Sequence, residues 1–225
     1  MTKVLIIPDI HNRFYEAEGI IMRENPDHTV FLGDYFDNYG DTPEYALQTA
    51  VWLKLSMENS NRTHLLGNHD LSYLDRLERC PGWEEWKQYA VNKTGIDLSK
   101  LELFCYVDDW LCTHAGLSRH FYDAYSRNGE TVKDFLERYS EDDDLVRRLY
   151  DCSYYRGGRD AFGGILWCDY EEFEDIPNQK QIFGHTHDVK PRTNIGKNLQ
   201  HICLDTFLRY YAIYNGKTME IKSVD

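Results

Sequence analysis

The chain has 225 residues, of which 42% are hydrophobic and 14% aromatic, and its formal net charge is −13. This composition excludes a disordered chain, and the length suits one domain, which we expect to span residues 1–225. The acidic total argues against a non-specific nucleic-acid binder, because neutralising phosphates requires a basic face.

The first third of the chain alternates strand and helix signals. Short apolar runs predict buried strands at residues 3–7, 28–32 and 63–66. Helices are predicted between them, at residues 14–24 and 42–57. In the second helix, Thr42 suits the N-cap and Pro43 the first turn. Alternation of this kind favours parallel strands joined by right-handed crossovers.

The rest of the chain favours antiparallel strands. Residues 103–114 predict two strands around an Asp108-Asp109 turn, and residues 118–150 a helical region with a solvated turn at 140–144. A short strand is predicted at 181–183. Residues 209–223 predict a hairpin around Asn215-Gly216, with a type I′ turn because Asn-Gly tolerates positive φ.

Six scattered cysteines form no C-x-x-C pair, and no secretory signal precedes them. This pattern indicates reduced thiols and a cytoplasmic protein. No apolar run approaches the length of a membrane span, so we expect no membrane association.

Acidic and histidine residues follow five of the predicted strands. In an open α/β sheet, ligands gather where strands end at their carboxyl edge, so these clusters predict one convergent site. Their side chains are nitrogen and oxygen donors suited to Mn, Fe or Zn, and they are too many for one tetrahedral ion. Two metal ions are the arrangement that clamps both oxygens of a phosphoryl displacement. The residues are Asp9 and His11; Asp34 and Asp37; Asn68, His69 and Asp70; His114; and His185 and His187.

The same segments resemble a known family. In chain order, "DIH", "GDYFD", "GNHD", "HAG" and "GHTH" are similar to the five signature blocks of the calcineurin-like metallophosphoesterases. "GDYFD", "GNHD", "HAGLS" and "ILWCD" look closest to the serine/threonine protein phosphatases and bacterial diadenosine tetraphosphatases, and "GHTH" is nearer the general phosphoesterases. The resemblance implies an α/β fold, a four-layer α-β-β-α sandwich of two mixed β-sheets flanked by helices.

The resemblance also implies a role for each residue. Two divalent ions, most simply Mn²⁺ but also Fe or Zn, would activate a bridging hydroxide for in-line attack on phosphorus. His69 would be the general acid or a donor to the phosphoryl oxygens, oriented by Asp37, with Asp70 as a supporting partner. The implied ligands are Asp9, His11 and His187 for one ion, Asn68, His114 and His185 for the other, and Asp34 bridging both.

The chain departs from the family pattern where phosphate is gripped. Asn38 follows Asp37 where the phosphatase branch has an arginine, and no arginine lies between Trp167 and His185. We therefore expect substitutes among other polar residues, because arginine binds phosphate oxygens bidentately. The candidate substrate-binding residues are Arg13, Asn38, Arg156 and Arg159.

Several other residues have two interpretations. Tyr35, Phe36 and Tyr39 either pack or line the cleft. For Trp83, Trp86 and Tyr89 core packing is the main expectation and a substrate-stacking wall the alternative. Four further histidines are expected to be structural or on the surface: His28, His64, His120 and His201.

The leading functional hypothesis is a phosphatase acting on a phosphomonoester or phosphoprotein. A dinucleoside polyphosphate hydrolase, such as one for diadenosine tetraphosphate, is an alternative within the same chemistry. A phosphodiesterase or nuclease is a further one, which the acidic charge disfavours. A catalytically silent scaffold is the alternative of another class, but such a protein would be expected to lose ligands, and here every position is filled.

Overall fold

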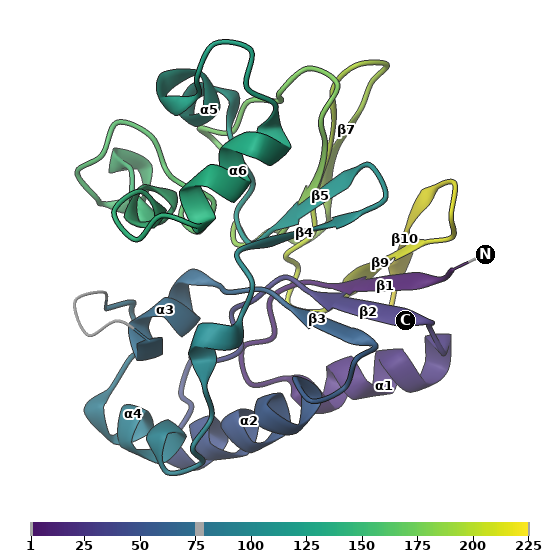
Figure 1. Cartoon of the computed structure of the whole chain (residues 1–225). Helices are drawn as coiled ribbons and strands as arrows, with labels where there is room; N and C mark the ends of the chain where they lie inside the picture. Colours follow the sequence, from purple (N-terminus) through teal and green to yellow (C-terminus); the bar gives the residue numbers. More distant parts are fainter. Residues whose placement is uncertain (1, 75–78, 225) are drawn as a thin grey trace.

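The computed structural model describes residues 2–74 and 79–224. Within them, two five-stranded mixed sheets stack face to face with helices on their outer sides, which confirms the four-layer sandwich (Figure 1). The first sheet has the order β10 (Met219–Ser223), β9 (Tyr210–Tyr214), β1 (Val4–Ile7), β2 (His28–Phe31) and β3 (Arg62–His64). The second has the order β4 (Phe104–Val107), β5 (Trp110–Thr113), β6 (Lys180–Phe183), β8 (Gln200–Cys203) and β7 (Arg192–Ile195).

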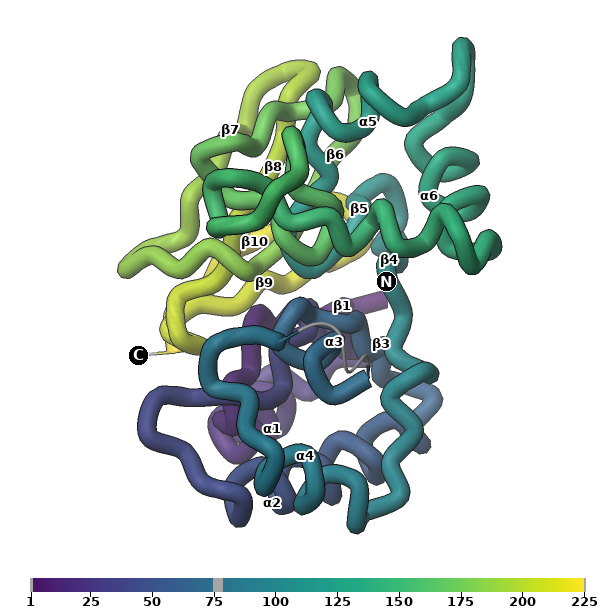
Figure 2. The backbone as a smooth tube through the Cα atoms, turned by 90° about the vertical axis from the view of Figure 1, so that its left-hand side faces the viewer, coloured from purple at the N-terminus to yellow at the C-terminus, as the bar shows by residue number. Residues whose placement is uncertain are grey.

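Each sheet is accompanied by helices on its outer face. The first sheet is covered by α1 (Phe14–Glu24), α2 (Pro43–Ser56) and α4 (Glu85–Asn92), with α3 (Asn68–Leu74) beyond β3. The second carries α5 (Arg119–Tyr125) and α6 (Val132–Ser140). Short 3₁₀ turns are η1 (Leu98–Lys100), η2 (Val146–Tyr150) and η3 (Tyr154–Arg156). After β8 of the second sheet, the chain returns to the first sheet and ends in the hairpin of β9 and β10, which is yellow in Figure 2.

Strand β1 shows why the layers form. Val4 and Ile6 belong to the core between the sheets, whereas Leu5 and Ile7 belong to the core under the helices. Successive strand side chains point to opposite faces, so a run of four apolar residues serves both layers at once. This continuous pattern predicted a strand buried on both faces.

Strand direction brings the five clusters to one edge. Strands β1, β2 and β3 are parallel, as are β5, β6 and β8. Parallel strands end on the same side of their sheet. The residues that follow β1, β2, β3, β5 and β6 therefore meet along one rim of the sandwich.

Two sequence expectations differ in detail. The helical region 118–150 is three separate pieces, because Gly129 turns with φ 77° and the exposed segment 141–144 ends α6. The C-terminal hairpin is confirmed, but its loop spans residues 215–218 and is not a type I′ turn. Asn215 keeps negative φ because its side chain accepts the Lys217 and Thr218 N–H groups, which forms an Asx turn.

The histidines outside the clusters have structural contacts. His64 is buried, stacks on Phe31 and is hydrogen-bonded to Ser56 and the Tyr35 hydroxyl. His201 is buried against Asp175. Burial, followed by the Arg62 charge, lowers the pKa of His64 to about 3.

The pKa of His64 predicts an acid-labile fold. In an unfolded chain a histidine takes up a proton near pH 6.5, whereas folded His64 stays neutral down to about pH 3. The free energy of unfolding is therefore unaffected by His64 above pH 6.5 and decreases progressively as the pH falls from 6.5 toward 3. Between pH 6.5 and 5 the loss is about 2 kcal/mol. His64→Gln should reduce the drop in unfolding free energy between pH 7 and 5 by about that amount, as measured by urea denaturation. An equal drop in both proteins would contradict the assignment.

Candidate metal centre

Two glycines let the strand ends approach closely. A side chain at Gly67 would place its Cβ 2.2 Å from the Asp34 carboxylate, and one at Gly184 would place it 2.0 Å from that of Asp9. Several cluster residues have left-handed backbones, namely His11, Asp34, Asp37 and His185, with φ of 41°, 52°, 63° and 67°. Such conformations are costly for residues other than glycine and gather at functional sites.

The structure brings the predicted ligands into two groups that share one carboxylate. The donor atoms of Asp9, His11 and Asp34 lie within 4.8 Å of one another, and so do those of Asp34, His114 and His185. Asp34 Oδ2 is 3.6 Å from His11 Nε2 and 3.5 Å from His114 Nε2. Asn68 Oδ1 adds a donor to the second group, 2.8 Å from His114 Nε2 and 2.9 Å from His185 Nδ1.

Hydrogen bonds behind the ligands fix which atoms face inward. His11 Nδ1 donates to the Phe36 and Asp37 carbonyls, and His114 Nδ1 donates to the Leu32 carbonyl at 2.9 Å. Asn68 Nδ2 donates to Cys80 Sγ. The inward atoms of the two rings and the amide are therefore acceptors. Acceptors that converge with no proton between them suit cations, and the set of nitrogen and oxygen donors fits two divalent ions.

The electrostatics also fit cations. Burial raises the pKa of Asp9, and the Asp205 and Asp34 carboxylates raise it further. For Asp34, burial is outweighed by His114, His69 and His11, so its pKa falls well below the usual range. Burial lowers the pKa of His114 and of His185, leaving both imidazoles neutral and able to ligate at pH 7. Buried carboxylates of this kind require pairing or a bound metal.

His187 stands beside these groups but lies farther out. Its side chain is 36% exposed, its Nδ1 is 3.7 Å from Asp205 Oδ2, and its ring contacts that of Phe207 with centroids 3.7 Å apart. It lines the same cavity as His185, but on the side of Asp205. The two histidines of "GHTH" thus face different parts of the site.

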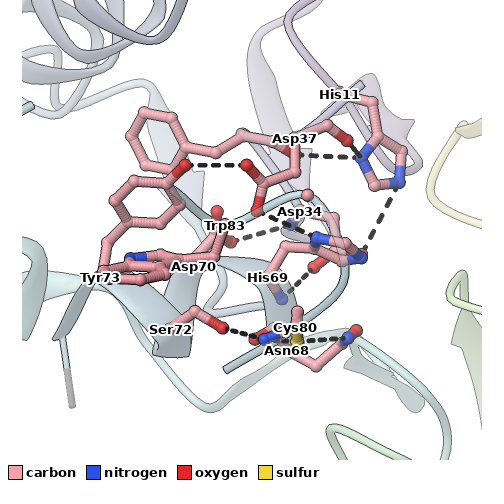
Figure 3. A network of polar contacts seen from close by, with 12 residues as sticks. His11, Asp34, Asp37, Asn68, His69, Asp70, Ser72, Tyr73, Cys80 and Trp83 are labelled. Carbon is pink, nitrogen blue, oxygen red and sulfur yellow. Dashed lines mark hydrogen bonds and ion pairs between the residues drawn. The ribbon is translucent and has the colours of Figure 1, made fainter. Parts of the chain in front are cut away.

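His69 is hydrogen-bonded to Asp37, and its ring centroid lies 5.2 Å from that of His11 in the first group. Its Nδ1 donates to Asp37 Oδ2 at 3.1 Å, and its backbone N–H donates to Asp34 Oδ1 at 2.9 Å (Figure 3). Burial would lower the pKa of His69, but Asp34 and then Asp37 outweigh it and raise it to about 9. Its imidazole therefore carries a proton at neutral pH.

Asp70 holds the surrounding loops together. Its carboxylate accepts the backbone N–H groups of Asp34, Tyr35 and Gly67 at 2.8 to 2.9 Å. Burial and the Asp34 charge raise its pKa. Asp70 thus fixes the position of Asp34 without facing the donor groups itself.

A cavity of about 480 Å³ opens above the donor groups. Of the four candidate substrate-binding residues, Arg156 lines it, whereas Arg13, Asn38 and Arg159 do not. Arg13 instead donates to the Phe207 carbonyl, Asn38 turns back onto the Tyr39 N–H, and Arg159 is exposed. A hollow of about 530 Å³ at the other end of the strands holds none of the predicted ligands.

The aromatic residues divide between the two interpretations. Tyr35 and Phe36 are fully buried, which confirms packing, whereas Tyr39 is fully exposed and neither packs nor lines the cavity. Trp86 and Tyr89 do not pack in the core, because α4 turns them outward and buries Lys87 instead. Trp83 is partly buried against the core, as expected.

The sequence interpretation missed four residues around the site. Lys87 is buried against Asp41 and lies 3.6 Å from Asp37. The Asp37 carboxylate also accepts the Tyr73 hydroxyl at 2.7 Å, as Figure 3 shows. Arg79 and Asp205 line the cavity. None of the four had a clear sequence signal, and the three apolar residues "ICL" before Asp205 are too short a run to mark a strand end.

Comparison with known proteins is consistent with this geometry. The sequence profile of the calcineurin-like phosphoesterase family matches residues 2–189. A comparison with curated proteins gives no match. The fold is similar to a protein serine/threonine phosphatase from Saccharomyces cerevisiae that resembles human phosphatase PP5, with 14% identity, a TM-score of 0.60, and 99% of this chain and 79% of that chain covered. It is also similar to a proposed diadenosine tetraphosphatase, with 18% identity, a TM-score of 0.54, and coverage of 99% and 93%.

Both structural likenesses have low identity and therefore establish the fold alone.

Among the described residues, no helix is long and apolar enough to cross a membrane.

Proposed function

Because this chain belongs to the calcineurin-like phosphoesterase family, whose members are metal-dependent hydrolases, we propose that it is a two-metal phosphatase acting on phosphomonoesters. The observation that carries the proposal is the sharing of Asp34 by two donor groups, Asp9 with His11 and His114 with His185. We propose Asp34 as the bridging ligand, Asn68 as a ligand of the second group and His187 as a ligand of the first. Mn²⁺ is the proposed ion.

Two divalent ions at this position would stabilise charge on the phosphoryl oxygens and make a bound water acidic. Around them the chain supplies orientation and a proton. The buried ligands keep their geometry before substrate arrives, because carbonyls and Cys80 fix the ring and amide orientations. Such preorganisation avoids reorganisation as charge develops.

His69 is the proposed general acid. Asp37 holds its Nδ1, which leaves Nε2 for the cavity that the ring lines. The hydrogen bond to Asp37 favours the protonated ring, so His69 is suited to give a proton to the leaving oxygen. Asp37 is itself fixed by Tyr73 and Lys87, so the ring cannot rotate freely.

Arg156 is the proposed phosphate-binding residue. Its Nη2 donates to Thr186 Oγ1 at 2.8 Å and its Nε lies 2.6 Å from Asp169, which places the guanidinium at the cavity wall. Its side chain is 29% exposed, so the remaining nitrogen can reach a ligand. Arginine in this position would substitute for those that the phosphatase branch carries elsewhere.

Arg156→Ala should raise KM for an aryl phosphate about 10- to 100-fold, because a charge-assisted hydrogen bond contributes about 1.5–3 kcal/mol. Arg159→Ala is the matched control, since it removes the same charge from the same loop outside the cavity. Steady-state kinetics of the two variants would decide the matter. Equal KM values in both would show that another group grips the phosphate.

The proposed function is tested by a substrate panel with added Mn²⁺. The substrates are an aryl phosphomonoester, an aryl phosphodiester, a phosphopeptide, diadenosine tetraphosphate and single-stranded DNA. We expect the phosphomonoester to give the highest kcat/KM and chelation by EDTA to remove the activity. Preference for diadenosine tetraphosphate would assign the alternative hydrolase activity, and preference for the diester or DNA would reject a phosphatase.

A further inference from the structure

We infer that Asp205 is a positioning residue of the metal centre, which orients His187 and places its Nε2 toward the first ion. This inference rests on the two-metal function proposed above and deepens it. Asp205 follows β8, the strand beside β6, so its carboxylate enters the site from a sixth strand end. It is 4% exposed and lines the cavity that contains His187.

The two oxygens of Asp205 have different partners. Oδ1 accepts the Phe207 backbone N–H at 3.2 Å, which holds the carboxylate in place. Oδ2 faces His187 Nδ1 at 3.7 Å, an ion-pair distance that is longer than a hydrogen bond. A carboxylate can only accept, so a hydrogen bond between the two requires the proton on His187 Nδ1 and leaves a lone pair on its Nε2.

The same device occurs behind two other ligands. His11 Nδ1 donates to the Phe36 and Asp37 carbonyls, and His114 Nδ1 donates to the Leu32 carbonyl. Each ring thereby offers Nε2 to its donor group. For His187 the facing acceptor is a carboxylate in place of a carbonyl, which would make Nε2 a stronger electron-pair donor to a metal ion. Partners of this kind orient metal-bound histidines generally.

The chain around Asp205 is shaped to hold the ring. Phe207 and Leu208 have consecutive left-handed backbones, with φ of 56° and 58°, although neither is glycine. This conformation brings the Phe207 ring against His187, and Arg13 secures it from behind by donating to the Phe207 carbonyl at 2.8 Å. His187 is therefore held on one edge by Asp205 and on one face by Phe207.

The test is a titration of metal-free protein with Mn²⁺ by calorimetry. Wild type should bind two ions. Asp205→Asn, which keeps the shape but loses the charge, should weaken one site about 10- to 100-fold and leave the other unchanged. Asp188→Asn is the matched control, because Asp188 lies next to His187 in sequence but pairs with Arg192. It should bind both ions as wild type does.

A second measurement concerns wild type alone. Long-range ¹H–¹⁵N NMR at pH 8 on the metal-free protein, assigned with His187→Gln, should show His187 with its proton on Nδ1. A proton on Nε2, or unaltered affinity of both sites in Asp205→Asn, would overturn the inference while leaving the two-metal function standing. A wild-type protein that binds fewer than two ions would overturn the function and the inference together.

Discussion

Asp34→Asn should abolish binding of at least one of the two metal ions and lower kcat/KM by a factor of ~10³ or more, a loss of about 4 kcal/mol. Asp34 is the one carboxylate common to both donor groups, and its Oδ2 lies 3.5–3.6 Å from a histidine of each. Removing its charge should therefore impair ligation in both groups.

Asparagine is the suitable replacement at this position. It tolerates the left-handed backbone of residue 34, where φ is 52°, and its oxygen can still accept the His69 N–H. Elemental analysis and steady-state kinetics would be measured beside Asp123→Asn, which removes an exposed carboxylate on α5. Full occupancy of both sites in Asp34→Asn would contradict a bridging role.

The sequence predicted the clusters well because local rules govern them. A buried apolar run followed by a polar residue marks a strand end, and parallel strands bring such ends together. This reasoning found Asp9, Asp34, Asn68, His114 and His185, which the structure gathers at one rim. Those predictions needed only short segments and the direction of the strands.

What the sequence did not indicate depends on contacts between distant segments. Arg13 is committed to the Phe207 carbonyl, 194 residues away, and no local pattern reveals that pairing. Lys87 is buried, although lysine is usually exposed, because its ammonium group pairs with the carboxylates of Asp41 and Asp37. The outward turn of Trp86 follows from the same burial.

Asp205 shows a different kind of failure. Its strand, β8, was not predicted, because "QHIC" is short and begins with two polar residues. Without the strand, the carboxylate after it had no reason to be placed at the rim. The two polar residues are nevertheless accommodated, since His201 is paired with Asp175 inside the second layer. Tertiary partners thus overrode the local pattern.

His69→Asn should separate proton donation from the other effects of the site. General acid catalysis contributes about 10²- to 10⁴-fold, and only when the leaving oxygen needs a proton. We expect kcat to fall by about that factor for an alkyl phosphate, a poor leaving group, and by less than about tenfold for an activated aryl phosphate. The metal content of His69→Asn should equal that of wild type, because the proposed ligand is the neighbouring Asn68 and not His69.

The companion variant is Asp37→Asn, which leaves the imidazole in place and removes its carboxylate partner. Because His69 draws its raised pKa first from Asp34 and then from Asp37, this variant should retain a weaker form of the same leaving-group dependence. In the pH profile of kcat, the decline that reports deprotonation of the His69 imidazolium should also occur at a lower pH than in wild type. If His69→Asn slows both substrates equally, His69 binds the phosphoryl oxygens and the leaving group takes its proton from water.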